Sequence, residues 1–271
     1  MVNVLYAGNK KVFDGLLISL LSMSKHTKEP IHAYVLTMDL SSQDERFVPI
    51  EDKQVEFLQG VIKRYNENVE ITKLDVTDLY NEKLGDSKNQ KTNFTPYTML
   101  RLLATHIDTL PDKIIYLDTD TIVNGDIASL YNIDLQDNEA GVVRDIRLRN
   151  HTYFKNYFNA GVMLLNLKKL KQTQAFDKAI NLCKTKRMFL VDQDALNDSI
   201  ESRVMLPSKF NEFRHHCKYY NEIVVHHMCN ARNKYFFLKR IKPWHTEQFV
   251  KSFPMYKDLI DEYLELKKQI N

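Results

Sequence analysis

The chain has 271 residues, of which 44% are hydrophobic and 27% are charged, and its formal net charge is +3. This length and composition predict a globular protein with a proper core and exclude a disordered or low-complexity chain. The net charge is too small for a nucleic-acid groove, so we expect no nucleic-acid partner. Basic residues do crowd the C-terminal third, which indicates a local anion site: Arg232, Lys234, Lys239, Arg240 and Lys242.

The cysteines and the apolar segments indicate in which cellular compartment the protein is expected. Cys183, Cys217 and Cys229 are widely spaced, without a Cys-x-x-Cys pair to hold zinc, and reduced cytoplasmic thiols are the default for such a set. The first strand-like run follows Met1 directly, without the basic and apolar regions of a signal peptide. No stretch approaches the roughly eighteen consecutive apolar residues of a membrane span. We expect a cytoplasmic protein whose membrane contact, if any, is peripheral and at the inner face.

Strand-like and helix-like segments alternate through the N-terminal half. Apolar or alternating runs predict strands at Val2–Gly8, Ile31–Met38 and Val69–Val76. Helical spacing of apolar residues predicts helices between them, at Val12–Lys25 and Lys53–Tyr65. Strands separated by helices predict a parallel sheet, which binds ligands at the carboxyl ends of its strands.

The second half continues with less regular elements. Helices are expected at Thr98–Ile107, Lys168–Lys184 and from Asp192 onward, and strands at Ile114–Leu117, Ala160–Leu167 and Ile223–Val225. Apolar residues at helical spacing in Met255–Gln269 predict a terminal amphipathic helix, packed on the domain rather than laid on a membrane. We therefore expect one domain at residues 1–245 and a helical tail at residues 246–271.

The strand Ile114–Leu117 ends in two carboxylates, Asp118 and Asp120. Side chains alternate faces along a strand, so the two carboxylates are expected on one side. Like charges repel unless something positive compensates them, and a divalent ion of the Mg²⁺ or Mn²⁺ type, bound with substrate phosphates, is the obvious candidate. A solvated turn with two acids is the structural alternative. The pattern thus predicts a metal site for a diphosphate substrate.

Several short motifs occur in an order that resembles a known family. They are Val4–Ala7, Arg101, Tyr116–Asp120, Phe158–Val162, Asp192–Asn197 and Lys242–Trp244. The set is similar to that of family 8 retaining glycosyltransferases, which include bacterial lipooligosaccharide galactosyltransferases and glycogenin. The resemblance implies a GT-A fold, an α/β single Rossmann-like domain with a mixed, mostly parallel sheet flanked by helices. It also implies retaining transfer of galactose or glucose from a UDP-sugar to a glycan, lipid-linked or protein-linked acceptor, with Mn²⁺ as cofactor and Mg²⁺ as the alternative.

The same resemblance assigns a metal site. Asp118 and Asp120 would hold the ion against the diphosphate, and His226 would be the third ligand, since it ends a Val-Val-His segment. An imidazole ligand favours Mn²⁺ over Mg²⁺. The adjacent His227 is the alternative, because neighbouring residues of a strand face opposite sides and only one can reach the aspartates. Lys242 would stabilise the departing diphosphate oxyanion, and a solvated basic loop is its structural alternative.

Further residues are assigned to catalysis on the donor sugar. Gln193 would face the anomeric carbon, and Asp192, Asp145 and Asn159 would hold sugar hydroxyls. An amide is a poor nucleophile beside the carboxylates that retaining glycosidases use. Same-face attack, with the leaving diphosphate deprotonating the acceptor, is therefore expected rather than a covalent intermediate. Asn159 and Asp192 have an ordinary alternative as helix or turn caps.

The nucleoside end of the donor is assigned with two departures from the family pattern. Ala7 and Asn9 would flank the nucleoside, with Lys11 close by, and Arg101 would brace the donor. Asn9 stands where many members have an acid near the uracil, which leaves the choice of base open. Lys242 also follows His226 at a longer distance than in the family, so that His227, Arg232 or Lys234 are candidates for part of the work.

Two other functions use similar residues. A sugar nucleotidyltransferase would also combine paired aspartates, a metal and this kind of sheet, but it needs a glycine-rich loop after the first strand to cradle a triphosphate. Here that place reads Gly8–Lys11, in a chain with only seven glycines. A non-catalytic sugar-nucleotide-binding protein on the same fold would lose the acids or Gln193, and all of them are present.

Overall fold

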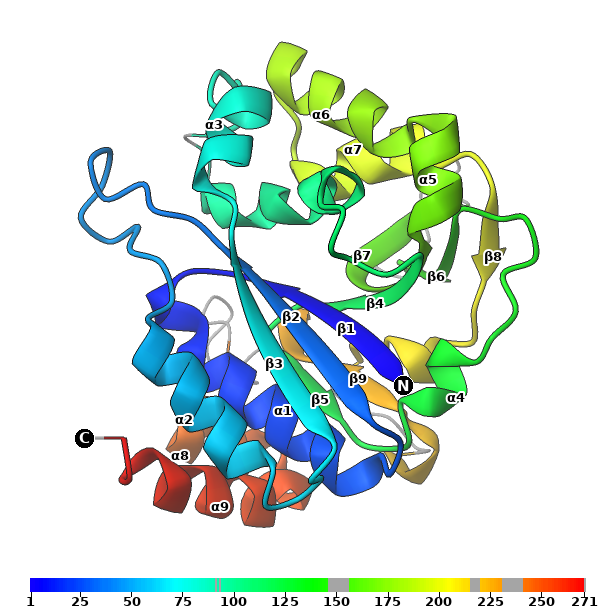
Figure 1. The fold of residues 1–271 in the computed structure, drawn as a ribbon. Coiled ribbons are helices and arrows are strands. Elements are labelled where there is room, and N and C mark those ends of the chain that lie inside the picture. The colour runs from blue at the N-terminus through cyan, green and yellow to red at the C-terminus, as the bar shows by residue number, and fades with distance from the viewer. Residues whose placement is uncertain (91, 93, 146–155, 215–219, 231–240, 271) are drawn as a thin grey trace.

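The computed structural model describes residues 1–90, 92, 94–145, 156–214, 220–230 and 241–270. Within these residues a seven-stranded sheet, in the order β3-β2-β1-β4-β7-β6-β8, crosses the molecule between two groups of helices (Figure 1). Its strands are β1 (Val2–Ala7), β2 (Ile31–Thr37), β3 (Val69–Asp75), β4 (Lys113–Leu117), β6 (Ala140–Arg144), β7 (Phe158–Asn166) and β8 (Arg203–Met205). The predicted strands at residues 2–8, 31–38, 69–76, 114–117 and 160–167 are all present, within a few residues of their expected ends.

The sheet is mixed, because one strand reverses its direction. Strands β3, β2, β1 and β4 are parallel to one another, whereas β7 is antiparallel to both β4 and β6. Strand β8 then adds in parallel to β6. The predicted fold class, a mostly parallel sheet flanked by helices, is confirmed.

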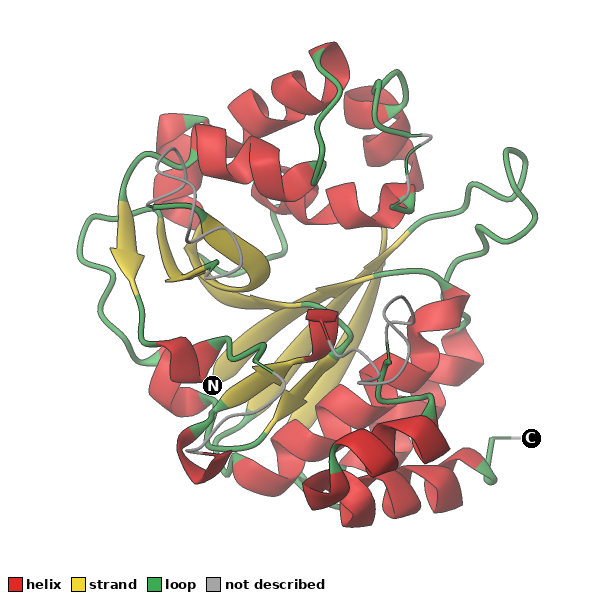
Figure 2. Ribbon diagram, turned by 180° about the vertical axis from the view of Figure 1, so that it is seen from behind, coloured by secondary structure: helices red, strands yellow, loops and turns green. Residues whose placement is uncertain are grey.

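Helices cover both faces of the sheet (Figures 1 and 2). One face carries α1 (Phe13–His26), α2 (Asp52–Ile62), α8 (Thr246–Ser252) and α9 (Lys257–Lys267). The other carries α3 (Thr77–Leu84), the 3₁₀ helix η2 (Pro96–His106), α5 (Leu167–Thr173), α6 (Ala175–Thr185) and α7 (Asp192–Ser199). A short helix, α4 (Ala128–Tyr131), lies near the amino end of β1.

Two hydrophobic cores result, one on each face of the sheet. In β4, Ile115 and Leu117 join the core under α1, while Ile114 and Tyr116 join the core under η2. This alternation follows from the pleat of the strand. A strand buried on both faces reads as a continuous apolar run, which is why β4 is recognisable in the sequence.

Two predicted elements differ from the structure in detail. The helix expected at Lys168–Lys184 is divided into α5 and α6 at Gln174, whose φ of 55° lies in the left-handed region and turns the chain. The strand expected at Ile223–Val225 is β9 (Val225–His227), and it pairs with β5 (Thr121–Val123) in a separate two-stranded sheet. Strand β6 and helix α3 have no counterpart among the predicted elements.

The C-terminal helices pack against α1 rather than projecting from the molecule. Phe249, Ile260 and Tyr263 are buried in the same core as α1, and ion pairs join Lys25 to Glu262 and Lys267 to Asp14. The division at residues 245 and 246 stays a prediction. Within the described residues no helix has both the length and the apolarity to cross a bilayer. Neither Cys183 nor Cys229 forms a disulfide within the described residues, and Cys217 lies outside them.

Candidate active site

The turn between β4 and β5 carries the two aspartates. Strand β4 ends just before Asp118, whose backbone N–H donates to the carbonyl of Gly161 on β7 at 2.8 Å. The chain then turns through Asp120 into β5, which pairs with β9 so that Thr121 lies opposite His227. A turn therefore brings the two carboxylates together. The expectation that the alternation of side chains along one strand does so is wrong.

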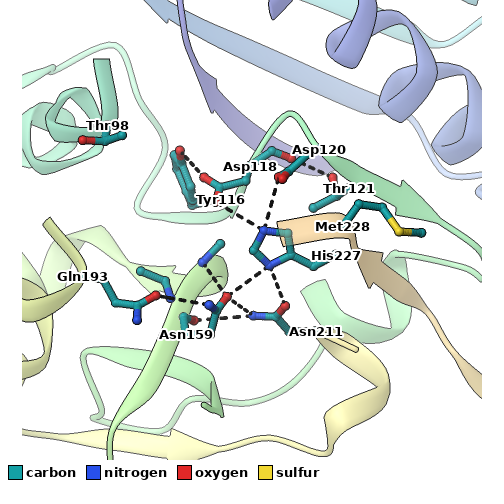
Figure 3. Close-up of polar contacts among 12 residues, drawn as sticks. Thr98, Tyr116, Asp118, Asp120, Thr121, Asn159, Gln193, Asn211, His227 and Met228 are labelled. Atoms are coloured by element: carbon teal, nitrogen blue, oxygen red, sulfur yellow. Dashed lines mark hydrogen bonds and ion pairs between the residues drawn. The ribbon is translucent and has the colours of Figure 1, made fainter. Parts of the chain in front are cut away.

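His227, and not His226, joins the aspartates (Figure 3). Its Nε2 lies 3.4 Å from Asp118 Oδ2 and 3.2 Å from Asp120 Oδ1. One ligand atom from each of the three residues lies within 4.8 Å of the other two. His226 faces the opposite side of β9, where its Nδ1 shares a hydrogen bond with the Tyr256 hydroxyl. The expectation that His226 reaches the aspartates is wrong, because the pairing of β9 with β5 turns the next residue toward them.

The ring of His227 is oriented by hydrogen bonds on its other nitrogen. Nδ1 lies 3.1 Å from Asn159 Oδ1 and 3.0 Å from Asn211 Oδ1, and both of these oxygens are acceptors. Nδ1 therefore carries a proton, which in the neutral ring leaves a lone pair on Nε2. This buried Nε2 has no hydrogen-bond partner among the described residues. The lone pair on Nε2 points toward two carboxylates, while two side-chain oxygens hold Nδ1. This is the arrangement expected of a histidine that binds a metal ion.

Gly161 leaves the space that this ring occupies. A Cβ atom at position 161 would lie 2.0 Å from Cε1 and 2.6 Å from Nδ1 of His227. Any side chain on β7 at this point would displace the imidazole from the aspartates. The glycine of the Phe158–Val162 motif is therefore explained by close packing against His227.

Two cations of the protein also face the aspartates. Arg101 Nη2 donates to Asp118 Oδ1 at 2.7 Å, and Lys242 Nζ pairs with Asp120 Oδ2. Burial raises the pKa of both carboxyl groups, but these cations outweigh it and hold both pKa values below the usual range. Repulsion between the carboxylates therefore does not by itself require a metal. Burial lowers the pKa of His227, but the surrounding negative groups outweigh burial and raise this pKa well above its usual value. A metal ion that binds Nε2 would therefore displace a proton from the imidazole.

Arg101 connects the aspartate turn to helix α7. Its Nε lies 3.0 Å from Asp192 Oδ2, and its Nη1 donates to the carbonyl of Ala160 at 2.6 Å. The guanidinium is 4.1 Å from the centre of the Tyr116 ring, which adds a cation–π contact. Burial raises the pKa of Asp192 to about 6, although Arg101 acts in the opposite direction. One buried guanidinium thus fixes Asp118 and Asp192 relative to each other.

Gln193 is held at the beginning of α7 by contacts on both ends of its amide. Its Oε1 accepts from Asn159 Nδ2 and from the backbone N–H of Ala160, both at 3.1 Å. Its Nε2 donates to the Tyr157 hydroxyl at 3.3 Å and lies 3.5 Å from Asp145 Oδ2. Asn159 therefore touches both Gln193 and His227, and it joins the two halves of the site (Figure 3).

A cavity of about 310 Å³ brings most of the expected residues together. It is lined by Ala7, Asn9, Arg101, Asp118, Asp120, Asn159, Asp192, Gln193 and Lys242, and also by His227. Asp145 and Lys11 are not among its lining residues. Asp145 is fully buried beside Gln193, and Lys11 faces a neighbouring cavity of about 510 Å³ that shares Asn9 with the first. The sequence thus places all but two of its site residues around one cavity, apart from the choice of histidine.

The side chain of Asn9 is already engaged within the protein. Its Oδ1 accepts from the backbone N–H of Lys11 at 3.0 Å, and its Nδ2 donates to the carbonyl of Arg46 at 3.3 Å. These contacts tie the end of β1 to the loop that follows β2. Asn9 therefore shapes the wall of the cavity through its backbone and its loop contacts.

Two residues of the site could not be predicted from the sequence. Asn211 and Tyr157 contact His227 and Gln193, respectively, yet neither belongs to a motif that indicates chemistry. They come from segments on either side of α7, and only the fold brings them together. The basic residues Arg232, Lys234, Lys239 and Arg240 lie outside the described residues.

The sequence of this chain matches the sequence model of a known protein family. The model described as glycosyl transferase family 8 matches residues 3–248. The chain belongs to glycosyl transferase family 8. The match covers every residue named above in the candidate site, so the resemblance drawn from the short motifs is confirmed at the level of the family.

Curated relatives of this family 8 chain are bacterial. It is 27% identical over 223 residues to a candidate glycosyltransferase of Haemophilus influenzae, covering 78% of this chain and 63% of the relative. It is 31% identical over 112 residues to a lipopolysaccharide 1,2-glucosyltransferase of Escherichia coli, covering 37% and 33%. It is 24% identical over 261 residues to a lipopolysaccharide 1,3-galactosyltransferase of Salmonella typhimurium, covering 90% and 73%. The chain thus spans less than two thirds of the first two relatives.

Solved structures support the fold of this family 8 chain. The galactosyltransferase LgtC, in complex with donor and acceptor sugar analogues, superposes with a TM-score of 0.71 at 21% identity, covering 96% of each chain. The bifunctional glycosyltransferase WbbM gives a TM-score of 0.68 at 17% identity, covering 97% of this chain and 51% of that one. The fold is therefore that of a GT-A glycosyltransferase, as the motifs imply.

Proposed function

We propose that the protein is a retaining hexosyltransferase that moves galactose or glucose from a UDP-sugar to a glycan or glycan-bearing acceptor, with Mn²⁺ as cofactor. The observation that carries the proposal is the single cavity in which Asp118, Asp120 and His227 face Gln193, in a chain of family 8. Curated relatives named as lipopolysaccharide galactosyl- and glucosyltransferases support a hexose as the transferred group.

The metal site would serve the diphosphate of the donor. Asp118, Asp120 and His227 would hold Mn²⁺, which supplies a Lewis acid for the charge that develops on the leaving group. The mixed oxygen and nitrogen donors favour Mn²⁺ over Mg²⁺. Lys242, whose Nζ lies against Asp120, would donate to the departing oxyanion. No nucleic-acid site and no membrane-embedded segment are part of this proposal.

The sugar would lie between the metal site and the beginning of α7. Asp192 lines the cavity, where its carboxylate can accept from a sugar hydroxyl, while Arg101 holds it in place. Asn159 is the less direct contact, because its amide already serves His227 and Gln193. Asp145 is best read as a support for the amide of Gln193, since it does not line the cavity.

The surroundings of Gln193 favour same-face attack over a covalent intermediate. Its Oε1 already accepts two hydrogen bonds, which lowers its nucleophilicity further and fixes its dipole. A fixed amide dipole stabilises a cationic sugar without forming a bond to it. The leaving diphosphate would then take the proton of the acceptor hydroxyl. Asp192, which precedes Gln193 in the chain, also lines the cavity, and its ion pair with Arg101 makes it a weaker nucleophile.

The function is tested by the stereochemistry of the product. The protein is incubated with UDP-galactose or UDP-glucose, Mn²⁺ and a panel of glycan acceptors, and the anomeric proton of the product is followed by NMR. We expect UDP release and an α-linked product from the α-linked donor. A β-linked product would contradict the retaining reaction. Release of pyrophosphate from UTP and a sugar phosphate would identify a nucleotidyltransferase instead, and donor binding without turnover would identify a binding protein.

Replacing Gln193 with alanine is expected to lower kcat by about 10–100-fold, because only positioning and electrostatic stabilisation are lost. An obligatory nucleophile would cost several orders of magnitude more. The measurement is steady-state UDP release with saturating donor. Mass spectrometry of the variant incubated with donor is the second measurement. A glycosyl adduct on the protein would overturn same-face attack.

A further inference from the structure

Strand β9 separates two different environments. His227 faces the aspartates, and the adjacent His226 faces the C-terminal segment. Both imidazoles are almost fully buried, at 3% and 2% exposure for His226 and His227. Both rings project from one three-residue strand, so a contact that holds His226 also bears on the position of His227.

His226 is anchored by the segment that connects α8 to α9. Its Nδ1 shares a hydrogen bond of 2.8 Å with the hydroxyl of Tyr256, and both groups are buried. The imidazole meets the Phe253 ring edge-on at 5.7 Å between centroids and the Tyr256 ring at 5.8 Å. Tyr256 in turn stacks on Phe249 of α8 at 5.9 Å. The C-terminal segment thus packs against the face of β9 that is opposite His227.

Strand β9 is held by backbone bonds on both of its sides. It pairs with the three residues of β5, and on its other edge the N–H of His227 donates to the carbonyl of Glu212 at 2.7 Å while the N–H of Glu212 donates to the carbonyl of Val225 at 3.0 Å. The N–H of Met228 donates to the carbonyl of Asp120 at 2.9 Å.

A metal site needs its ligand atoms held in place by supporting hydrogen bonds. Asn159 and Asn211 hold the ring of His227 on its own side of β9. The hydrogen bond of His226 to Tyr256 is a further side-chain anchor on the opposite side of the strand.

We propose that Tyr256 is a positioning residue for metal binding, which holds His227 Nε2 against Asp118 and Asp120 through its hydrogen bond to His226. This inference rests on the proposed function, because it takes the three residues as metal ligands. It gives the C-terminal segment a second role besides covering α1. The hydroxyl of Tyr256 lies on the far side of β9 from the cavity, and it acts only through the strand.

The test is Tyr256→Phe, which removes one hydroxyl and keeps the ring. Mn²⁺ affinity is measured by electron paramagnetic resonance titration of the full chain without donor, well below the melting temperature. We expect the dissociation constant to rise about three- to tenfold, as the loss of one buried hydrogen bond that positions a ligand would produce. The variant His226→Phe should give a similar rise, and combining both changes should weaken binding no further.

Tyr263→Phe is the matched control. Tyr263 is also buried, lies on α9 and not on the segment that holds His226, and accepts from Lys267 Nζ at 3.1 Å. This variant should lower the melting temperature and leave Mn²⁺ affinity unchanged. Wild-type affinity in Tyr256→Phe, or an equal loss of affinity in Tyr263→Phe, would overturn the positioning role. Failure of the unmodified protein to bind Mn²⁺ would instead overturn the metal site itself, and with it this inference.

Discussion

Asp120→Asn is expected to lower turnover at least about a thousandfold and to abolish tight Mn²⁺ binding, because a metal Lewis acid supplies several kcal/mol of stabilisation in the transition state. Asparagine keeps the shape of the side chain and can still accept from Lys242. The amide is therefore preferable to alanine, which would leave the ammonium group of Lys242 without this partner. Turnover is measured as UDP release, and the fold is checked by thermal unfolding.

The control for this variant is Asp126→Asn. Asp126 is exposed in the turn after β5, where its Oδ1 accepts from the N–H of Ala128, a bond that an amide oxygen can keep. It should retain wild-type turnover. In the unmodified protein, EDTA should abolish activity and Mn²⁺ should restore it better than Mg²⁺. Undiminished transfer in chelator, or a folded Asp120→Asn protein with normal turnover, would show that the acids are structural.

His227→Ala is expected to raise the Mn²⁺ dissociation constant by more than about a hundredfold. Loss of an outer-sphere partner typically costs 10–100-fold in metal affinity, and a direct ligand should cost more. His227 Nε2 is the nitrogen that lies 3.2 Å and 3.4 Å from the two carboxylates. Calorimetric titration of Mn²⁺ into each folded variant measures the effect.

The neighbouring histidine provides the comparison. His226→Phe keeps an aromatic ring between Phe253 and Tyr256, and it should raise the dissociation constant by no more than about tenfold. The opposite order, with His226 the more damaging position, would shift the register of β9 by one residue. It would also restore the ligand set that the family resemblance implies from sequence.

The architecture and most of the residues around the cavity could be predicted from local sequence patterns and ordered motifs. Apolar runs bounded by turns marked β1, β2 and β4, because a strand buried on both faces has a local signature, and alternation marked the edge strand β3. The spacing of strands and helices then placed Gly8 and Asp118 at the carboxyl edge of a parallel sheet. Gln193, Asp192 and Lys242 followed from ordered motifs, and the cavity contains all three.

The assembly of the site, in contrast, depends on how the folded chain packs in three dimensions. Strand β9 has three residues, too few for a periodic pattern, so the face of each histidine depends on pairing with β5 about a hundred positions earlier. A shift of one residue exchanges the two faces of a strand, and local sequence therefore cannot distinguish His226 from His227. The same holds for the compensation of Asp120 by Lys242 and for the contact of Asn211 with His227. These contacts join distant segments, and packing rather than local pattern fixes them.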